Sequence, residues 1–162
     1  MPGDWNTRIA AVWADDSLSD ADRIGRIDAL AGERDPGDAR ALFERAGARD
    51  SAGLETEAEP LYRRALDAGL DDEHRPQAVI QLASTIRNLG RVDESLALLR
   101  AEYERAPGSR FHDAAAAFYA LALVSTGDAI AAASVALKAL APHLPRYTRS
   151  VSAYADELVS TD

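Results

Sequence analysis

The sequence reads GLETEAEPLYRRAL at residues 53–66, GRVDESLALLRAEY at 90–103 and GDAIAAASVALKAL at 127–140. These stretches begin with Gly53, Gly90 and Gly127, which are 37 residues apart. After each glycine, apolar and small residues recur at the spacing of one face of a helix. A fixed period of this length is typical of paired helices that stack on one another, and it decides the fold more firmly than local propensity does.

The composition favours helix along the whole chain. Alanine makes up roughly a fifth of the residues, and it has the highest helix propensity. Aromatic residues amount to only 6%. The flanks also show helical periodicity, which predicts an N-terminal helix pair at about 5–14 and 19–32 and a C-terminal capping helix at about 146–159. We therefore expect an all-α fold with almost no strand.

The segment 76–109 is similar to a tetratricopeptide repeat, a motif of 34 residues with W-x2-L-G-x2-Y on its first helix and A-x3-F on its second. The first-helix positions hold apolar or small residues, the A-x3-F positions hold Ser95 and Leu99, and Pro107 stands at the closing position. The four first-helix residues are Val79, Leu82, Ala83 and Ile86. Small residues at such positions allow two helices to approach closely.

A longer run extends this resemblance. EAEPLYRRALDAGLDDEHRPQAVIQLASTIRNLGRVDESLALL at 57–99, followed by ALAPHLPRY at 139–147, resembles the bacterial group 5 tetratricopeptide family. The resemblance covers about 39–147. It implies a right-handed α-α superhelix, a TPR solenoid of about three helix-turn-helix repeats that mediates protein–protein contact. It brings no catalytic residues.

The predicted organisation is a single domain over 1–162. An N-terminal helical cap (1–38) precedes repeats at 39–75, 76–109 and 110–146, and a capping helix (147–162) closes the stack, because open stacks need polar caps. The first repeat departs from the family pattern, since Arg45 and Arg49 stand where Leu and Tyr are expected. Residues 71–75 and 108–112 contain the additional residues that lengthen the 34-residue motif to a period of 37, and they are expected to be loops between repeats.

The resemblance also implies a concave groove, which in this family is lined by positions 2, 5, 9, 12 and 13 of each first helix. Phe43 and Gly47 occupy the positions where chaperone adaptors carry the Lys and Asn of a carboxylate clamp, so binding to chaperone tails is not expected. The predicted partner-binding residues are Arg40, Phe43, Asp50, Gln77, Ile80, Ser84, Arg87, Asn88 and Leu121. In the alternative interpretation, Arg87 pairs with Asp50 between repeats and the apolar members belong to the core.

Composition argues against several classes of function. The formal net charge of −9 opposes the neutralisation of phosphates that nucleic-acid binding requires. The chain has no cysteine, which excludes disulfides, thiolate metal sites and a cysteine nucleophile, and suits a reducing cytoplasm. No apolar stretch reaches the roughly 18 residues of a membrane span, and the N-terminus does not read as a signal peptide.

No pattern of catalytic or metal-binding residues is present in the sequence. His74, His112 and His143 are widely spaced near predicted turns and are expected to be surface or capping residues. The acidic run 71–73 precedes a helix and suits its N-terminal dipole. Phosphate-binding glycine loops and the G-x-S-x-G motif are absent. We therefore expect no enzyme, no cofactor and no metal.

The sequence thus predicts a non-enzymatic cytoplasmic scaffold that binds a peptide or protein segment in the concave groove. The alternative is a structural self-association module with no dedicated peptide ligand, a homodimer formed through the exposed end of the stack or through the alanine-rich face at 114–136. No nucleic-acid or membrane partner is expected in either case.

Overall fold

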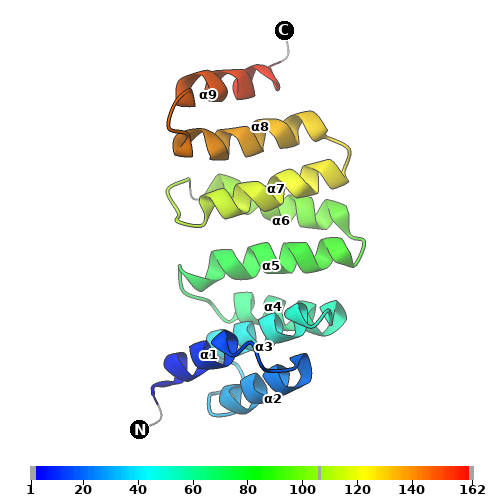
Figure 1. The fold of residues 1–162 in the computed structure, drawn as a ribbon. Coiled ribbons are helices and arrows are strands. Elements are labelled where there is room, and N and C mark those ends of the chain that lie inside the picture. Colours follow the sequence, from blue (N-terminus) through cyan, green and yellow to red (C-terminus); the bar gives the residue numbers. More distant parts are fainter. Residues whose placement is uncertain (1–2, 106, 161–162) are drawn as a thin grey trace. The chain divides into compact units, whose positions relative to one another are not determined.

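The structure, a computed structural model, describes residues 3–105 and 107–160. The described residues form α-helices and one short 3-10 helix and contain no strand, which confirms the all-α prediction (Figure 1). The helices are α1 (Trp5–Ala14), α2 (Asp20–Ala31), α3 (Ala39–Ser51), α4 (Glu55–Asp67), α5 (His74–Asn88), α6 (Val92–Arg105), α7 (His112–Ser125), α8 (Ala129–Leu140), η1 (Ala141–His143) and α9 (Thr148–Glu157).

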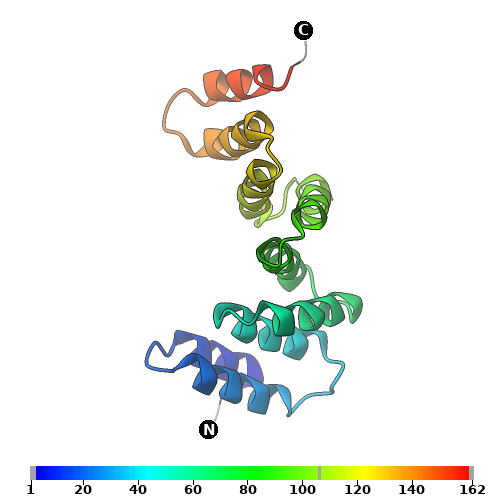
Figure 2. The ribbon, with the colours of Figure 1, turned by 90° about the vertical axis from the view of Figure 1, so that its right-hand side faces the viewer.

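The chain forms two compact units, one up to Thr85 and one from Ile86 onward. In the first unit, α1 packs on α2, α2 on α3 and α3 on α4. In the second unit, α6 packs on α7, α7 on α8 and α8 on α9 (Figure 2). Within each unit, these helices thus pack on their neighbours in the chain, as stacked helical repeats require. Residues 1–2, 106 and 161–162 of the predicted caps and second repeat lie outside the described residues.

The N-terminal helix pair forms close to its predicted bounds. The side chain of Asp4 caps α1 by accepting from the backbone N–H of Thr7 at 2.8 Å, and Ser19 caps α2 by accepting from Asp22 at 3.1 Å. The pair has an apolar core that also includes a residue of α3, so it is packed against the first repeat. This core consists of Ile9, Val12, Ile27, Leu30 and Ala48.

Three turns repeat the same backbone geometry, at the glycines that define the sequence period. Gly53, Gly90 and Gly127 have φ angles of 73°, 86° and 91°, in the left-handed region that favours glycine. In each turn, the N–H after the glycine bonds the carbonyl five residues earlier, which is the Schellman motif that ends a helix. These bonds are Leu54 to Arg49 at 2.9 Å, Arg91 to Ile86 at 3.1 Å and Asp128 to Leu123 at 2.9 Å.

The two arginines that depart from the family pattern both reach α2. Arg45 Nε donates to Asp28 Oδ1 at 2.9 Å, and Arg49 Nη2 donates to Asp28 Oδ2 at 2.8 Å. Burial raises the pKa of Asp28, but the hydrogen bonds from Arg49 and Arg45 outweigh this effect and lower it below its usual value. The first repeat therefore contacts the preceding helix through a charged cluster where other repeats use large apolar residues.

Some predicted loop and helix limits differ in the structure. Helix α5 begins at His74, so the predicted loop 71–75 ends inside a helix. Asp71 explains this early start, because its Oδ1 accepts from the backbone N–H groups of His74 at 2.8 Å and Glu73 at 3.0 Å. Helix α9 is shorter than the predicted 146–159, and η1 was not predicted.

The repeated turn makes a direct prediction for stability. Replacing Gly53 by alanine should lower the free energy of unfolding by about 1–2 kcal/mol, because a Cβ is unfavourable at positive φ. Gly25→Ala is the matched control, since Gly25 lies in the interior of α2 with open space around it and should gain about 0.5–1 kcal/mol. Urea unfolding followed by circular dichroism measures both, and an equal response of the two variants would contradict the prediction.

Candidate functional site

The first unit contains a cavity of about 440 Å³. Four helices contribute to it, and α3 supplies most of the lining because one of its faces runs along the whole cavity. The lining residues are Trp13 of α1, Arg40, Phe43, Glu44, Gly47, Asp50 and Ser51 of α3, Tyr62 of α4, and His74, Gln77 and Gln81 of α5. Side chains that are distant in the sequence are thereby brought to one site.

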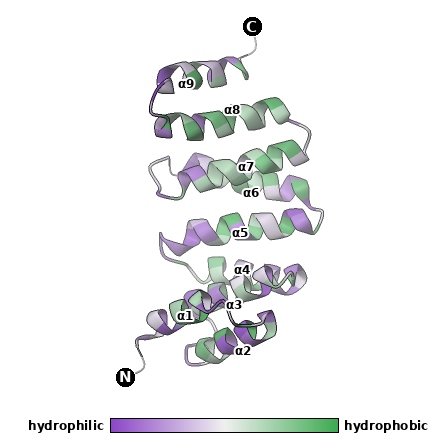
Figure 3. Ribbon diagram, viewed as in Figure 1, coloured by the Kyte–Doolittle hydropathy of each residue, from purple (hydrophilic) through white to green (hydrophobic). Residues whose placement is uncertain are grey.

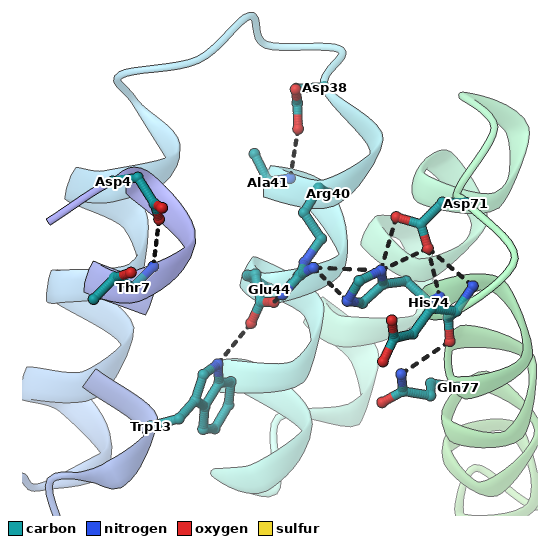
Figure 4. A network of polar contacts seen from close by, with 11 residues as sticks. Asp4, Thr7, Trp13, Asp38, Arg40, Ala41, Glu44, Asp71, His74 and Gln77 are labelled. Carbon is teal, nitrogen blue, oxygen red and sulfur yellow. Dashed lines mark hydrogen bonds and ion pairs between the residues drawn. The ribbon is translucent and has the colours of Figure 1, made fainter. Parts of the chain in front are cut away.

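A buried carboxylate, Glu44, holds one side of the cavity together (Figure 4). Its side chain is only 5% exposed. Trp13 Nε1 donates to Glu44 Oε2 at 2.6 Å, while Arg40 donates to Oε1 from Nε at 2.8 Å and from Nη2 at 2.6 Å. A buried charge is tolerated only when it is paired and hydrogen-bonded. Glu44 therefore fixes Trp13 of α1 and Arg40 in one arrangement.

Arg23 of α2 makes a second contact with the Trp13 side chain. Arg23 of α2 lies with its guanidinium carbon 5.7 Å from the centre of the Trp13 ring, and its Nη1 donates to the carbonyl of Val12 at 2.9 Å. The arginine thus satisfies a carbonyl at the end of α1 and places a cation near the indole ring. These contacts give the cavity a rigid aromatic wall.

His74 joins α5 to the same network. Its Nδ1 lies 2.7 Å from Asp71 Oδ1, and Nη1 of Arg40 contacts its Nε2 (Figure 4). A neutral ring with its hydrogen on Nδ1 satisfies both contacts, because Nδ1 then donates to Asp71 and Nε2 accepts from Arg40. The ring also meets Phe43 edge-on, with centroids 5.7 Å apart. The hydrogen bond from the backbone N–H of His74 lowers the pKa of Asp71.

Asp50 lies at the other end of the cavity and is held by hydroxyl groups. Thr85 Oγ1 lies 2.9 Å from Asp50 Oδ1, and the Tyr62 hydroxyl lies 3.2 Å from Oδ2. Burial raises the pKa of Asp50, and these two hydrogen bonds do not fully compensate for the lost hydration. Burial also raises the pKa of Tyr62, whose side chain is completely buried.

The structure brings part of the predicted groove together. Arg40, Phe43, Asp50 and Gln77 line the cavity, whereas Ile80 and Ser84 do not. Phe43 and Ile80 are largely buried, with exposed fractions of 7% and 6%. Arg87, Asn88 and Leu121 belong to the second unit, where Leu121 is 49% exposed. Their role, and the pairing of Arg87 with Asp50, stay predictions.

Five lining residues lie outside the first-helix groove positions expected from the resemblance, which Arg40, Phe43, Gly47, Asp50, Ser51 and Gln77 occupy. They are Trp13, Glu44, Tyr62, His74 and Gln81. Arg40 and Glu44 are spaced as an i,i+4 ion pair, which is the one signal that pointed to Glu44. His74 was expected to be a surface or capping residue, yet its side chain is only 17% exposed and faces the cavity. The other residues share no sequence pattern with the predicted positions.

Comparison with known families agrees with this architecture. The chain matches the family described as tetratrico peptide repeat, TPR_5, over residues 39–158. Because the match covers well over half of the chain, the protein belongs to the tetratricopeptide repeat family. A search of curated proteins found no match. Members of this repeat class are typically non-enzymatic scaffolds for protein–protein interaction.

Two further findings concern the described residues only. No helix in that part of the chain has both the length and the apolar character needed to cross a membrane. Residues 3–105 and 107–160 also contain no group of three or more His, Asp or Glu side chains placed to hold a metal ion.

The pKa directions of Asp50 and Asp28 predict opposite effects of the same substitution. A raised pKa costs the folded state stability at pH 7, and that cost disappears as the pH falls to the unfolded value of about 4. Asp50→Asn should therefore raise the free energy of unfolding at pH 7 and change it little at low pH. Asp28→Asn should lower it by about 1 kcal/mol at pH 7, because the lowered pKa reflects stabilising contacts that are lost in acid.

Urea unfolding of both variants at pH 7 and at low pH measures this difference. If Asp50→Asn destabilised the protein at pH 7 as Asp28→Asn does, the Asp50 carboxylate would be a stabilising group and the prediction would be wrong.

Proposed function

We propose that the protein is a scaffold that binds an extended peptide or protein segment through the cavity of its first unit. The observation that carries the proposal is that Arg40, Phe43, Asp50 and Gln77, selected from the sequence as partner-binding residues, line one cavity. Its volume lies within the range of about 300–1,000 Å³ that is typical of ligand sites. Ile80 and Ser84 are proposed to extend this surface within the first unit, while Arg87, Asn88 and Leu121 are proposed as partner-binding residues of the second unit.

The network around Glu44 supports a binding role over a purely structural one. Polar groups that line an open cavity are fixed in orientation before any partner arrives, which reduces the entropy cost of binding. The proposed scaffold has no enzymatic activity and no cofactor. A bacterial cytoplasm suits it, because its fold depends on no disulfide.

Gly47 offers a test that leaves every polar group in place. A Cβ at this position would meet Trp13 Cζ2 at 3.5 Å and the Tyr62 hydroxyl at 3.9 Å, both of which are ordinary contacts. Gly47→Ala should therefore fold well, while the longer side chain of Gly47→Leu should fill space between Trp13 and Tyr62. A displayed library of random peptides, about 12 residues long, is selected on the full wild-type chain, and binding is measured by titration.

The selected peptides should bind Gly47→Ala like wild type and bind Gly47→Leu at least about tenfold more weakly. Circular dichroism checks that both variants keep their helices. If no peptide is selected, or if Gly47→Leu binds as tightly as Gly47→Ala, the cavity is not the binding site and the proposal fails.

A second candidate is self-association through the second unit, and exposed apolar side chains favour it. Helices α7 and α8 are largely hydrophobic (Figure 3). Leu121, Val124 and Ile130, close to the turn between them, are 49%, 56% and 61% exposed. Exposed apolar residues that gather on one region commonly mark a contact with another chain.

Sedimentation equilibrium tests this candidate. If a homodimer forms through this region, replacing Val124 and Ile130 by lysine should shift the equilibrium to the monomer. The control replaces the exposed neighbours Ser125 and Ala129 by lysine, which adds the same charge without removing a large apolar side chain. A wild type that is monomeric at every concentration, or equal dissociation of both variants, would exclude the candidate.

A further inference from the structure

We infer that the cavity of the first unit receives a basic side chain, lysine or arginine, from the bound segment, and that Asp50 faces its charge. This inference rests on the proposed function, because it names the chemistry of the partner at the same cavity.

The two carboxylates of the cavity differ in how they are neutralised. Glu44 is paired with Arg40, whose Nη2 lies 2.6 Å from its Oε1. Asp50 is bonded by the hydroxyl groups of Thr85 and Tyr62, and no arginine, lysine or histidine among the described residues of the first unit bonds it. The charge of Glu55, which has the same sign, adds to the effect of burial in raising the pKa of Asp50. The Asp50 end of the cavity therefore lacks a cation.

Both hydroxyl groups that bond Asp50 also face a second acceptor. The Thr85 hydroxyl is within bonding distance of both Asp50 Oδ1 and the carbonyl of Gln81, each at 2.9 Å. The Tyr62 hydroxyl is within reach of Asp50 Oδ2 at 3.2 Å and Gln81 Oε1 at 2.8 Å. Each hydroxyl has one hydrogen, so neither hydroxyl donates to Asp50 alone. A lysine ammonium brings three donors and an arginine guanidinium brings five.

The walls of the cavity suit the aliphatic stem of such a side chain. Trp13, Phe43 and Tyr62 all line the cavity, and the rings of Phe43 and Tyr62 lie 6.3 Å apart. Lysine and arginine bury their methylene stems against apolar surface and place their charge at a polar end. A cation close to aromatic rings gains further attraction from their electron-rich faces.

The other charges of the cavity do not oppose a cation at Asp50. Arg40 precedes Asp50 by ten residues on α3, which is about 15 Å along a helix axis. Its charge is also compensated by Glu44. Asp50 lies in the last turn of α3, where the helix dipole places partial negative charge, so the local potential favours a cation. The raised pKa of Asp50 agrees with a carboxylate that lacks an ionic partner.

Metal binding at Asp50 is the less suitable alternative. The described residues contain no group of three or more potential His, Asp or Glu ligands. A basic side chain needs only one carboxylate, and charge-assisted hydrogen bonds of this kind are about twice as strong as neutral ones.

The test uses capped heptapeptides, acetyl-Gly-Ala-Ala-Xaa-Ala-Ala-Gly-amide, in which the central residue is lysine, arginine, norleucine or glutamate. Norleucine has the apolar stem without the charge. Each peptide is titrated into the full chain labelled with nitrogen-15, and the indole N–H resonances of the two tryptophans are followed. Trp13 lines the cavity, while Trp5 donates to the carbonyl of Leu30 elsewhere and serves as an internal control.

The lysine and arginine peptides should shift the Trp13 resonance and bind at least about tenfold more tightly than the norleucine peptide. Trp5 should not respond. The advantage should disappear in Asp50→Asn and persist in Asp67→Asn, which removes the same charge from an exposed position of the same unit.

Several outcomes would overturn the inference. They are equal binding of the norleucine peptide, tighter binding of the glutamate peptide, an advantage that survives Asp50→Asn, or no response of Trp13 up to about 10 mM of the basic peptides. A response that appears only in Arg87→Ala would assign the cation to Arg87 of the chain itself. The proposed function fails separately, since it depends on whether selected peptides of any composition lose binding in Gly47→Leu.

Discussion

The fold of this protein depends on reversing the chain after the first helix of each repeat, and left-handed glycines make that reversal possible. At Gly53, Gly90 and Gly127 the backbone adopts positive φ, and the following N–H caps the preceding helix in the same way each time. Because the turn is short, the second helix must pack against the first. Repetition of one backbone geometry therefore produces repeated helix pairs and leaves their outer faces free to vary in chemistry.

In the first unit, the variable helix faces carry carboxylates that are partly or wholly buried. Asp28 accepts hydrogen bonds from Arg45 and Arg49. Glu44 is paired with Arg40 and accepts a hydrogen bond from the indole of Trp13. Both clusters join a helix of the N-terminal pair to α3, so the cap also forms one wall of the cavity. Asp50 has no such ionic partner in the first unit, and the hydrogen bonds from Thr85 and Tyr62 offset only part of the cost of its burial. A group that costs the folded state stability is typical of functional sites, where stability is traded for function.

The sequence predicted most accurately the features that depend on local backbone conformation, which are the helices and the turns between them. The period of the glycines and the spacing of apolar residues gave the all-α fold, the N-terminal helix pair and the tetratricopeptide family. The family geometry identified Arg40, Phe43, Asp50 and Gln77, because first-helix positions recur at fixed spacing. It did not identify Trp13, since a cap has no repeat position, or Tyr62, which lies on α4, the second helix of its repeat.

The sequence alone determined the secondary structure, the repeat class and the acidic character of the chain, because propensity, periodicity and charge are properties of neighbouring residues. Only the tertiary structure decided which carboxylate is paired and which is not. Asp28, Glu44 and Asp50 are all acidic residues within helices, yet the groups that bond them come from helices α1 to α5. The physical reason is that the energy of a buried charge depends on the groups within a few ångströms of it, and helix packing, rather than sequence distance, brings those groups together.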